Sequence, residues 1–234
     1  ENKDGVYVAN STITVTYIYT KNDGVVSEEV SKDGLETVGG IDSAFNYTIT
    51  YNGTVDEYVG EVTLEVKDVL PFEIDVEKSN IAGGIYNKED KTITWTLTKE
   101  ISEEDKVVSF EKEISLYYIN VDSDEVSNKV ETKLVYGDNE ETNEDEFVTV
   151  VEKGKLSVIY KTTDGVILEQ LPETEEMGGV EYTTSEKEFY GYTLTGMPEN
   201  NDGVYIANST VTVTYIYTKN DGVVSEEVSK EGLE

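Results

Sequence analysis

The stretch that decides the fold class runs from residue 62 to residue 70 and reads Val62-Thr63-Leu64-Glu65-Val66-Lys67-Asp68-Val69-Leu70. Its apolar residues recur at every second position, which is the period of a β-strand with one buried face. The same period occurs in the runs 15–20, 47–51, 92–97, 114–121, 130–136 and 213–218. No run has the period of a helix. The sequence therefore predicts an all-β protein.

Short turn-forming groups separate these runs. They are Asn22-Asp23-Gly24, Asn52-Gly53, Gly83-Gly84, Gly137-Asp138-Asn139 and Asp164-Gly165. Asn, Asp and Gly accept positive φ, so they favour tight connections between strands. Many short strands at this spacing are typical of a β-sandwich.

The charge balance excludes several classes of function. Fifty acidic residues stand against 18 basic ones, a net charge of −32, and the chain has no Arg, His or Cys. A surface this negative repels nucleic acids and anionic membranes, and no stretch approaches the roughly 18 apolar residues of a membrane span. Without thiolates or imidazoles the usual nucleophiles, bases and soft metal ligands are missing. We expect a protein that is not an enzyme and that holds no cofactor.

One segment of the chain occurs twice. Residues 1–36 return as residues 199–234 with four differences, a period of 198 residues. A period this long is that of whole domains in a tandem array. Neighbouring copies of the same repeat are therefore the first partners that the sequence predicts, and a fibre is the predicted assembly.

The expected boundaries follow from this period. We predict a sandwich over 21–148 and a smaller β module over 149–218. Residues 1–20 are expected to be the C-terminal half of a preceding module, and residues 219–234 the first strand of the next sandwich. The acidic run 138–146 is expected to be a solvated linker or loop, because it lacks the spacing and central Gly of an EF-hand calcium loop.

Three polar residues fall on predicted apolar faces. Lys32 shares its face with Val26 and Val30, although Glu28 interrupts it. Asp68 lies in the aliphatic row of 62–70, and Asn128 lies in the row of 126–134. Burying a Lys, an acid and an amide is costly unless they meet. The alternatives are a Lys that reaches water at a strand end, an Asp in the turn before Pro71 and an Asn that caps a strand.

If the three residues meet, they have a chemistry of their own. Burial favours the neutral amine of Lys32 and the protonated acid of Asp68. A neutral amine held against the Asn128 carboxamide can attack its carbon while the acid moves protons, which releases ammonia and leaves an amide cross-link. This hypothesis places the cross-link between the first and last strands of the sandwich.

The first unit resembles the Ig-like, collagen-adhesin-type repeat domains of Gram-positive surface proteins. The resemblance rests on 46–51, 66–71, 83–86, 92–95 and 126–130, which read NYTITY, VKDVLP, GGIY, TITW and VSNKV. Many such domains form an autocatalytic Lys–Asn isopeptide bond assisted by an acid. The resemblance implies these roles for Lys32, Asp68 and Asn128, and it makes Lys230 the twin of Lys32 in the next copy.

The second unit, 155–218, resembles the mucin-binding-protein (MucBP) repeat of bacterial adhesins. The matching features are Val158-Ile159-Tyr160, Asp164-Gly165, Gly179 with Tyr182-Thr183-Thr184, Gly191-Tyr192-Thr193-Leu194 and the run 211–217. Together the two resemblances imply Ig-like sandwiches that alternate with small elongated MucBP-type modules in a stalk on the extracellular surface of a Gram-positive cell. They also imply mucin or other host glycans as partners in some relatives.

Several interpretations stay open. Val211, Val213, Tyr215 and Tyr217 share one strand face, which favours core packing over a glycan-binding surface. The acidic loop 122–125 could bind calcium. A glycosidase would need two placed acids in a cleft, for which no motif is present.

Overall fold

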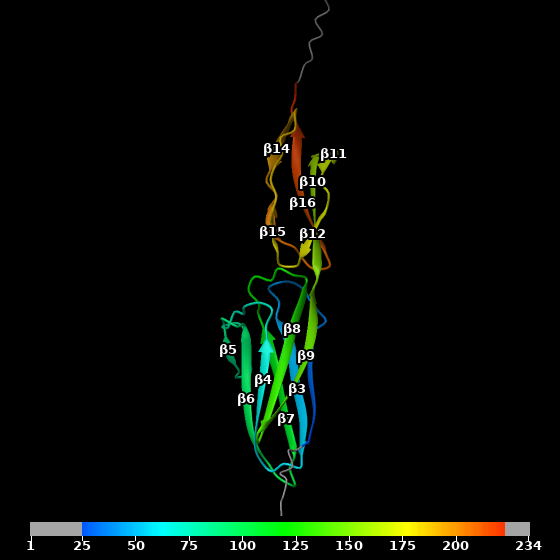
Figure 1. Cartoon of the computed structure of the whole chain (residues 1–234). Helices are drawn as coiled ribbons and strands as arrows, with labels where there is room; N and C mark the ends of the chain where they lie inside the picture. The colour runs from blue at the N-terminus through cyan, green and yellow to red at the C-terminus, as the bar shows by residue number, and fades with distance from the viewer. Residues whose placement is uncertain (1–24, 223–234) are drawn as a thin grey trace, which may run out of the picture.

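The computed structural model describes residues 25–222, and it consists of β-strands in two units that lie end to end (Figure 1). The prediction of an all-β protein is confirmed. Within the described residues there is no helix long and apolar enough to cross a membrane. The predicted half-module at 1–20 and the twin residue Lys230 lie outside the described residues.

The first unit is a sandwich of two sheets. The smaller sheet has the order β1-β3-β7, all antiparallel, with β1 Val25–Gly34, β3 Phe45–Asp56 and β7 Val107–Leu116. The larger sheet has the order β2-β9-β8-β4-β6-β5. Its strands are β2 Thr37–Val38, β9 Asn139–Val151, β8 Glu125–Tyr136, β4 Gly60–Val69, β6 Thr92–Ile101 and β5 Ile85–Asn87.

The apolar rows of both sheets meet between the layers. Phe45, Ile49, Leu64, Val66 and Leu116 are each fully buried there. In β4 and β8 the buried residues alternate with partly or fully exposed ones along the strand, as the sequence predicts. Burial of this much apolar surface is the main driving force for the sandwich.

The second unit is smaller. Its sheet has the order β11-β10-β16-β14, and β12 also pairs with β10. The bounds are β10 Lys153–Thr162, β11 Ile167–Gln170, β12 Thr174–Met177, β14 Tyr192–Gly196 and β16 Thr210–Lys219. Strands β13 Glu181–Thr183 and β15 Asp202–Val204 form a separate two-stranded ribbon. β10 and β16 are parallel, whereas the other pairs are antiparallel.

Tyrosines build the core of this module. Tyr160 of β10 stacks on Tyr215 of β16 with 5.1 Å between ring centroids, and Tyr217 is buried beside them. Val213 is also fully buried. The core-packing interpretation of the stripe on β16 is therefore confirmed, whereas Tyr190, before β14, is 90% exposed.

The acidic run is not a linker. Residues 139–151 form β9, which pairs with β8 along its whole length, so the sandwich ends at Val151 rather than at 148. Its acids have partners on other strands. Glu140 pairs with Lys133, Glu144 with Lys129 and Glu146 with Ser127, while Glu141 accepts from Tyr136 and Asp145 from the Lys32 backbone.

Two smaller expectations also differ. Asn52-Gly53 is not a turn but lies inside β3, where Gly53 leaves room for the Tyr51 ring and its hydroxyl, which donates to Glu28 at 2.7 Å. The run 114–121 is strand only as far as Leu116. Its strand, β7, also begins earlier than predicted, at Val107. By contrast, Gly83, Gly137 and Gly165 have the positive φ that their predicted turns require.

The two units are joined closely. Only Glu152 separates β9 from β10. Across the joint, the Ile41 amide donates to the Gly178 carbonyl at 2.9 Å, and Lys153 pairs with Asp124 at 2.6 Å. A Cβ on Gly178 would lie 2.1 Å from the Gly39 carbonyl oxygen, so the approach of the two backbones requires glycine there.

Candidate cross-link site

The structure brings Lys32, Asp68 and Asn128 together between the two sheets of the sandwich, near one end of their strands. Lys32 comes from β1 of the smaller sheet, and the other two come from neighbouring strands β4 and β8 of the larger sheet. Asp68 is opposite Val130 in the β4–β8 register, so Asn128 is its diagonal neighbour on the same face. All three are buried, with 2%, 0% and 0% exposure. The alternatives of a water-reaching Lys, a turn Asp and a capping Asn are therefore wrong.

Asp68 contacts both of the other residues. The Lys32 amine donates to Asp68 Oδ1, and Asn128 Nδ2 donates to Asp68 Oδ2 at 3.3 Å. The acid thus lies between the amine and the amide, with one oxygen toward each. This is the arrangement needed for a group that shuttles protons between an attacking amine and a leaving amide nitrogen.

Burial shifts the pKa of both Lys32 and Asp68. It lowers the pKa of Lys32 below its ordinary value, and the nearby Asp68 carboxylate opposes this only in part. Burial likewise raises the pKa of Asp68, against the opposing effect of Lys32. Both shifts favour a neutral amine facing a protonated acid.

One atom of the site lacks a partner. Asn128 Oδ1 is buried and accepts no hydrogen bond from the part of the chain that the structure describes. Leaving such an oxygen unpaired in the interior costs about 1–3 kcal/mol.

Aromatic side chains close the site. The Tyr47 ring lies 4.7 Å from Lys32 Nζ, and Tyr118 is buried nearby against Phe45. Sequence reasoning did not assign these rings to the site, although Tyr47 lies in the alternating run 47–51. They form part of the apolar surroundings that bury the amine.

Asp145 is the other residue that sequence reasoning missed. Its carboxylate accepts from the Lys32 backbone amide at 2.7 Å. The predicted linker over 138–146 hid it, because this run has no apolar residue that would mark a strand, although it follows β8 directly in a β-hairpin.

The position of Asn128 corrects one further expectation. Lys32 lies on the first strand, but Asn128 lies on β8, which is the penultimate strand of the sandwich. A Lys32–Asn128 bond would therefore leave β9 between the cross-link and the second unit.

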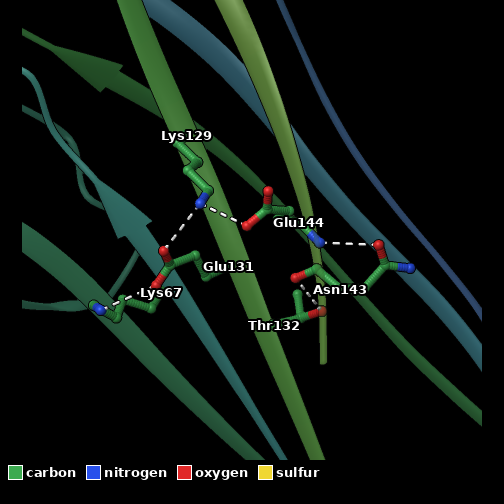
Figure 2. Close-up of polar contacts among 6 residues, drawn as sticks. All are labelled: Lys67, Lys129, Glu131, Thr132, Asn143 and Glu144. Atoms are coloured by element: carbon green, nitrogen blue, oxygen red, sulfur yellow. Dashed lines mark hydrogen bonds and ion pairs between the residues drawn. The ribbon is translucent and has the colours of Figure 1, made fainter. Parts of the chain in front are cut away.

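The outer face of the same strands carries charges (Figure 2). Glu131 of β8 pairs with Lys67 of β4 at 3.1 Å and with Lys129 at 3.2 Å, and Lys129 pairs with Glu144 of β9 at 2.5 Å. Thr132 points to the other side and donates to the Asn143 carbonyl oxygen of β9 at 3.3 Å. Each exposed pair contributes little by itself, at most ~1 kcal/mol. Together they oppose a one-residue slip that would turn Asn128 out of the core.

A groove of about 600 Å³ lies in the second unit. Its walls combine apolar residues of β10 with polar residues of the β13 region, among them Glu181, Thr183, Ser185 and Lys187. The tyrosines at its base are committed elsewhere, since Tyr160 donates to the Ser185 carbonyl, Tyr182 to that of Asn200, and Tyr205 bonds with Thr174.

No metal site is evident in the described part. Residues 25–222 contain no group of three or more acids arranged to hold an ion. In the loop 122–125, Asp124 pairs with Lys153 of the second unit.

Comparisons with known proteins match part of this chain to a domain family and nearly the whole chain to larger proteins. Residues 155–218 match the model of the MucBP domain family, which confirms the predicted resemblance of the second unit. Internalin J of Listeria monocytogenes serotype 4b is 25% identical over 252 residues, covering 94% of this chain and 25% of that protein. Internalin J of serovar 1/2a is 26% identical over 220 residues, covering 94% and 19%. The chain thus spans a quarter or less of the length of these relatives.

Two solved structures of pilins are also similar. Domains D2 and D3 of the major pilin SpaD from Corynebacterium diphtheriae have a TM-score of 0.44 and 13% identity, covering 82% of this chain and 99% of theirs. BcpA, the major pilin subunit of Bacillus cereus, has a TM-score of 0.44 and 13% identity, covering 84% and 71%.

Proposed function

We propose that this chain is a load-bearing repeat of a fibre or stalk on the surface of a Gram-positive cell, and that its sandwich forms a Lys32–Asn128 isopeptide bond by itself. The observation that carries the proposal is the buried contact of Asp68 with both Lys32 and Asn128. The role is structural and adhesive rather than enzymatic, because the only reaction is with the chain itself.

The reaction begins from the neutral pair. Lys32 Nζ, deprotonated in its apolar surroundings, attacks Cγ of Asn128. The fixed strands hold amine and amide together, which replaces a bimolecular encounter by an intramolecular one. Asp68, protonated, gives its proton to the amide and receives one from the attacking nitrogen.

The atoms balance without any co-reactant. A bond forms between Lys32 Nζ and Asn128 Cγ, the bond from Cγ to Nδ2 breaks, and Nδ2 leaves as ammonia. Asp68 ends protonated, as it began. The product is a neutral amide, so the cost of burying a charged Lys is removed.

The unpaired Asn128 oxygen supports the role of the acid. If the amide turns about its last side-chain bond, Oδ1 takes the place of Nδ2 beside Asp68. Protonated Asp68 would then donate to Oδ1, which pairs the orphaned oxygen and polarises the carbonyl for attack.

The surface and the shape suit a stalk. The net charge of −32 keeps an exposed fibre soluble and resists collapse of neighbouring stalks on each other. The units lie end to end, and the repeat of 1–36 at 199–234 supports an array in which 219–234 begins the next copy. Neighbouring repeats are accordingly the proposed partners.

Intact-mass measurement of the purified chain tests the cross-link. We expect a mass lower than that of the sequence by one ammonia. Lys32→Met, Asp68→Ala and Asn128→Ala should each restore the full mass. Lys67→Met is the matched control, since Lys67 neighbours Asp68 on β4 but points outward, and it should keep the loss. A wild-type mass equal to that of the sequence overturns the proposal.

A second candidate function is glycan binding by the second unit. It is favoured by the polar-walled groove and by the MucBP match of the residues that line it. Titration of the chain with purified mucin tests it. Thr183→Arg places a large side chain in the groove, and Thr195→Arg on β14, outside the groove, is the matched control. Saturable binding lost only in the first variant supports a receptor role, and no saturable binding leaves the structural role alone.

A further inference from the structure

We infer that the outer end of the second unit is a docking surface for the base of the sandwich in the next copy of the repeat. The inference rests on the tandem-array part of the proposed function, but not on the cross-link. It concerns the joint between copies, whereas the joint described above lies within one copy.

The docking surface, here called the tip, is apolar. It consists of Val166 and Ile167 at the β10–β11 turn and Tyr190 before β14. Their exposed fractions are 56%, 57% and 90%. The two segments lie at the same end of the unit as the exit of β16, since Thr162 pairs with Tyr217 and Tyr192 with Lys219. These three large apolar side chains do not belong to the core of the unit, and exposed apolar side chains gathered at one end are typical of an interaction surface.

The opposite end of the chain carries a matching surface, here called the base. It is formed by Val59, which is 65% exposed, by the half-buried Tyr58 and by Val107, which is 48% exposed. Val25 pairs with Asp56 beside them, so the chain enters the sandwich at the base.

The repeat brings tip and base together. Residues 25–36 recur as 223–234 with one difference, so Val223 is the twin of Val25. β16 ends at Lys219, which leaves three residues before Val223. Four Cα–Cα steps span at most ~14 Å when fully extended. A sandwich that starts at residue 223 therefore has its base against the tip.

The joint within the copy shows how short a connection these units use. There a single residue, Glu152, connects two strands, and backbone hydrogen bonds close the joint. The tip–base joint has a slightly longer connection. The joint within the copy is closed by a contact between glycines, whereas the tip and the base each offer an apolar surface. Covering them against each other removes both from water.

A chain with two complete copies tests the inference. It is made by adding residues 37–222 after Glu234, which continues the natural period. The protein has no Cys, so Glu188→Cys in the first copy and Glu61→Cys in the second give two unique positions for spin labels, both exposed and beside the proposed contact. Pulsed electron paramagnetic resonance should give one narrow distribution of the distance between the two labels.

The variants decide the outcome. The pair Val166→Ser and Ile167→Ser in the first copy should widen the distribution. Ile85→Ser, at an even more exposed position on edge strand β5, should leave it narrow. A broad distribution in the parent chain, or no response to the tip variant, overturns the inference. The mass of the same samples reports loss of two ammonia molecules independently, so failure of the joint and failure of the cross-link are distinguishable.

Discussion

The carboxylate of Asp145 on β9 accepts a hydrogen bond from the backbone amide of Lys32 on β1, with 2.7 Å between oxygen and nitrogen. The two strands belong to different sheets, so no ladder connects them. Asp145 therefore fixes the position of Lys32 along the sandwich, and it does so from the strand that follows the one that carries Asn128. The hydrogen bond thus connects β1, an edge strand of the smaller sheet, to β9, the last strand of the sandwich, beside the candidate cross-link.

Replacing Asp145 should weaken the sandwich. Asp145→Ala removes the acceptor and leaves the Lys32 amide without it, which should cost about 1–2 kcal/mol in the free energy of unfolding. Urea unfolding in the Asn128→Ala background measures this without the cross-link. Glu144→Ala, on the same strand but in an exposed ion pair, is the control and should change little. Equal effects of the two substitutions would contradict a positioning role for Asp145.

Local patterns were sufficient for part of this site. The inward direction of Lys32, Asp68 and Asn128 follows from strand alternation, which depends on neighbours two residues away. Their meeting does not, because it depends on which strands pair and on how the sheets face each other. The resemblance to isopeptide-forming domains supplied that step.

Two errors have a different cause, because the contacts concerned are local. Residues 138–146 look like a solvated loop because the run is mostly acidic and contains no apolar residue. In the fold, Lys129 and Lys133 of β8 provide partners across the strand pair. Gly53 looks like a turn residue, but it serves the packing of Tyr51. In both places the charge or turn propensity of single residues concealed a strand that its neighbours in sequence complete.

The buried amine predicts a pH dependence in the uncross-linked protein. In Asn128→Ala, burial keeps the pKa of Lys32 below its unfolded value of 10.5. Between the two values the unfolded chain holds a proton that the folded chain does not, so stability should rise as the pH is raised toward 10.5. Within this window the free energy of unfolding should increase by about 1.4 kcal/mol for each pH unit. The increase is read as the difference in unfolding free energy from Lys32→Met/Asn128→Ala.

The acid gives the opposite slope. The folded pKa of Asp68 is raised above 3.8, so the folded chain keeps a proton that the unfolded chain has released. Stability from this group should be present below pH 3.8 and fall as the pH rises through the window up to the folded pKa. Asp68→Asn in the same background should remove this slope. A fall that persists in the variant would assign it to other carboxyl groups.

The joint within the copy depends on Gly178. In Gly178→Ala the new Cβ would lie 2.1 Å from the Gly39 carbonyl oxygen, a backbone atom that cannot move without displacing its loop. We expect the two units to stay folded but to separate at the joint, which small-angle scattering detects as a broader range of shapes. Gly39→Ala is the matched control, because a Cβ there meets no atom within 4 Å. An unchanged scattering profile in Gly178→Ala would show that the contact does not hold the joint.

The cross-link to the penultimate strand predicts how the sandwich responds to force. When the chain is pulled at Val25 and Val151, the force passes through β1, the Lys32–Asn128 bond and the β8–β9 hairpin. Residues 33–127 lie inside the loop that this bond closes, so they carry no force. Because Asn128 is opposite Phe147, near the far end of β9, the load shears β9 along β8 across most of their paired length, which resists better than peeling. When fully extended, the path from Val25 to Val151 should be about 110 Å long in the wild type and about 440 Å long in Lys32→Met, at ~3.5 Å per extended residue, so single-molecule unfolding should release about 330 Å more from the variant. An equal released length in both proteins would show that the force does not pass through the proposed Lys32–Asn128 bond. No release at all in the wild type would show that Lys32 is bonded to a residue of β9 instead of Asn128.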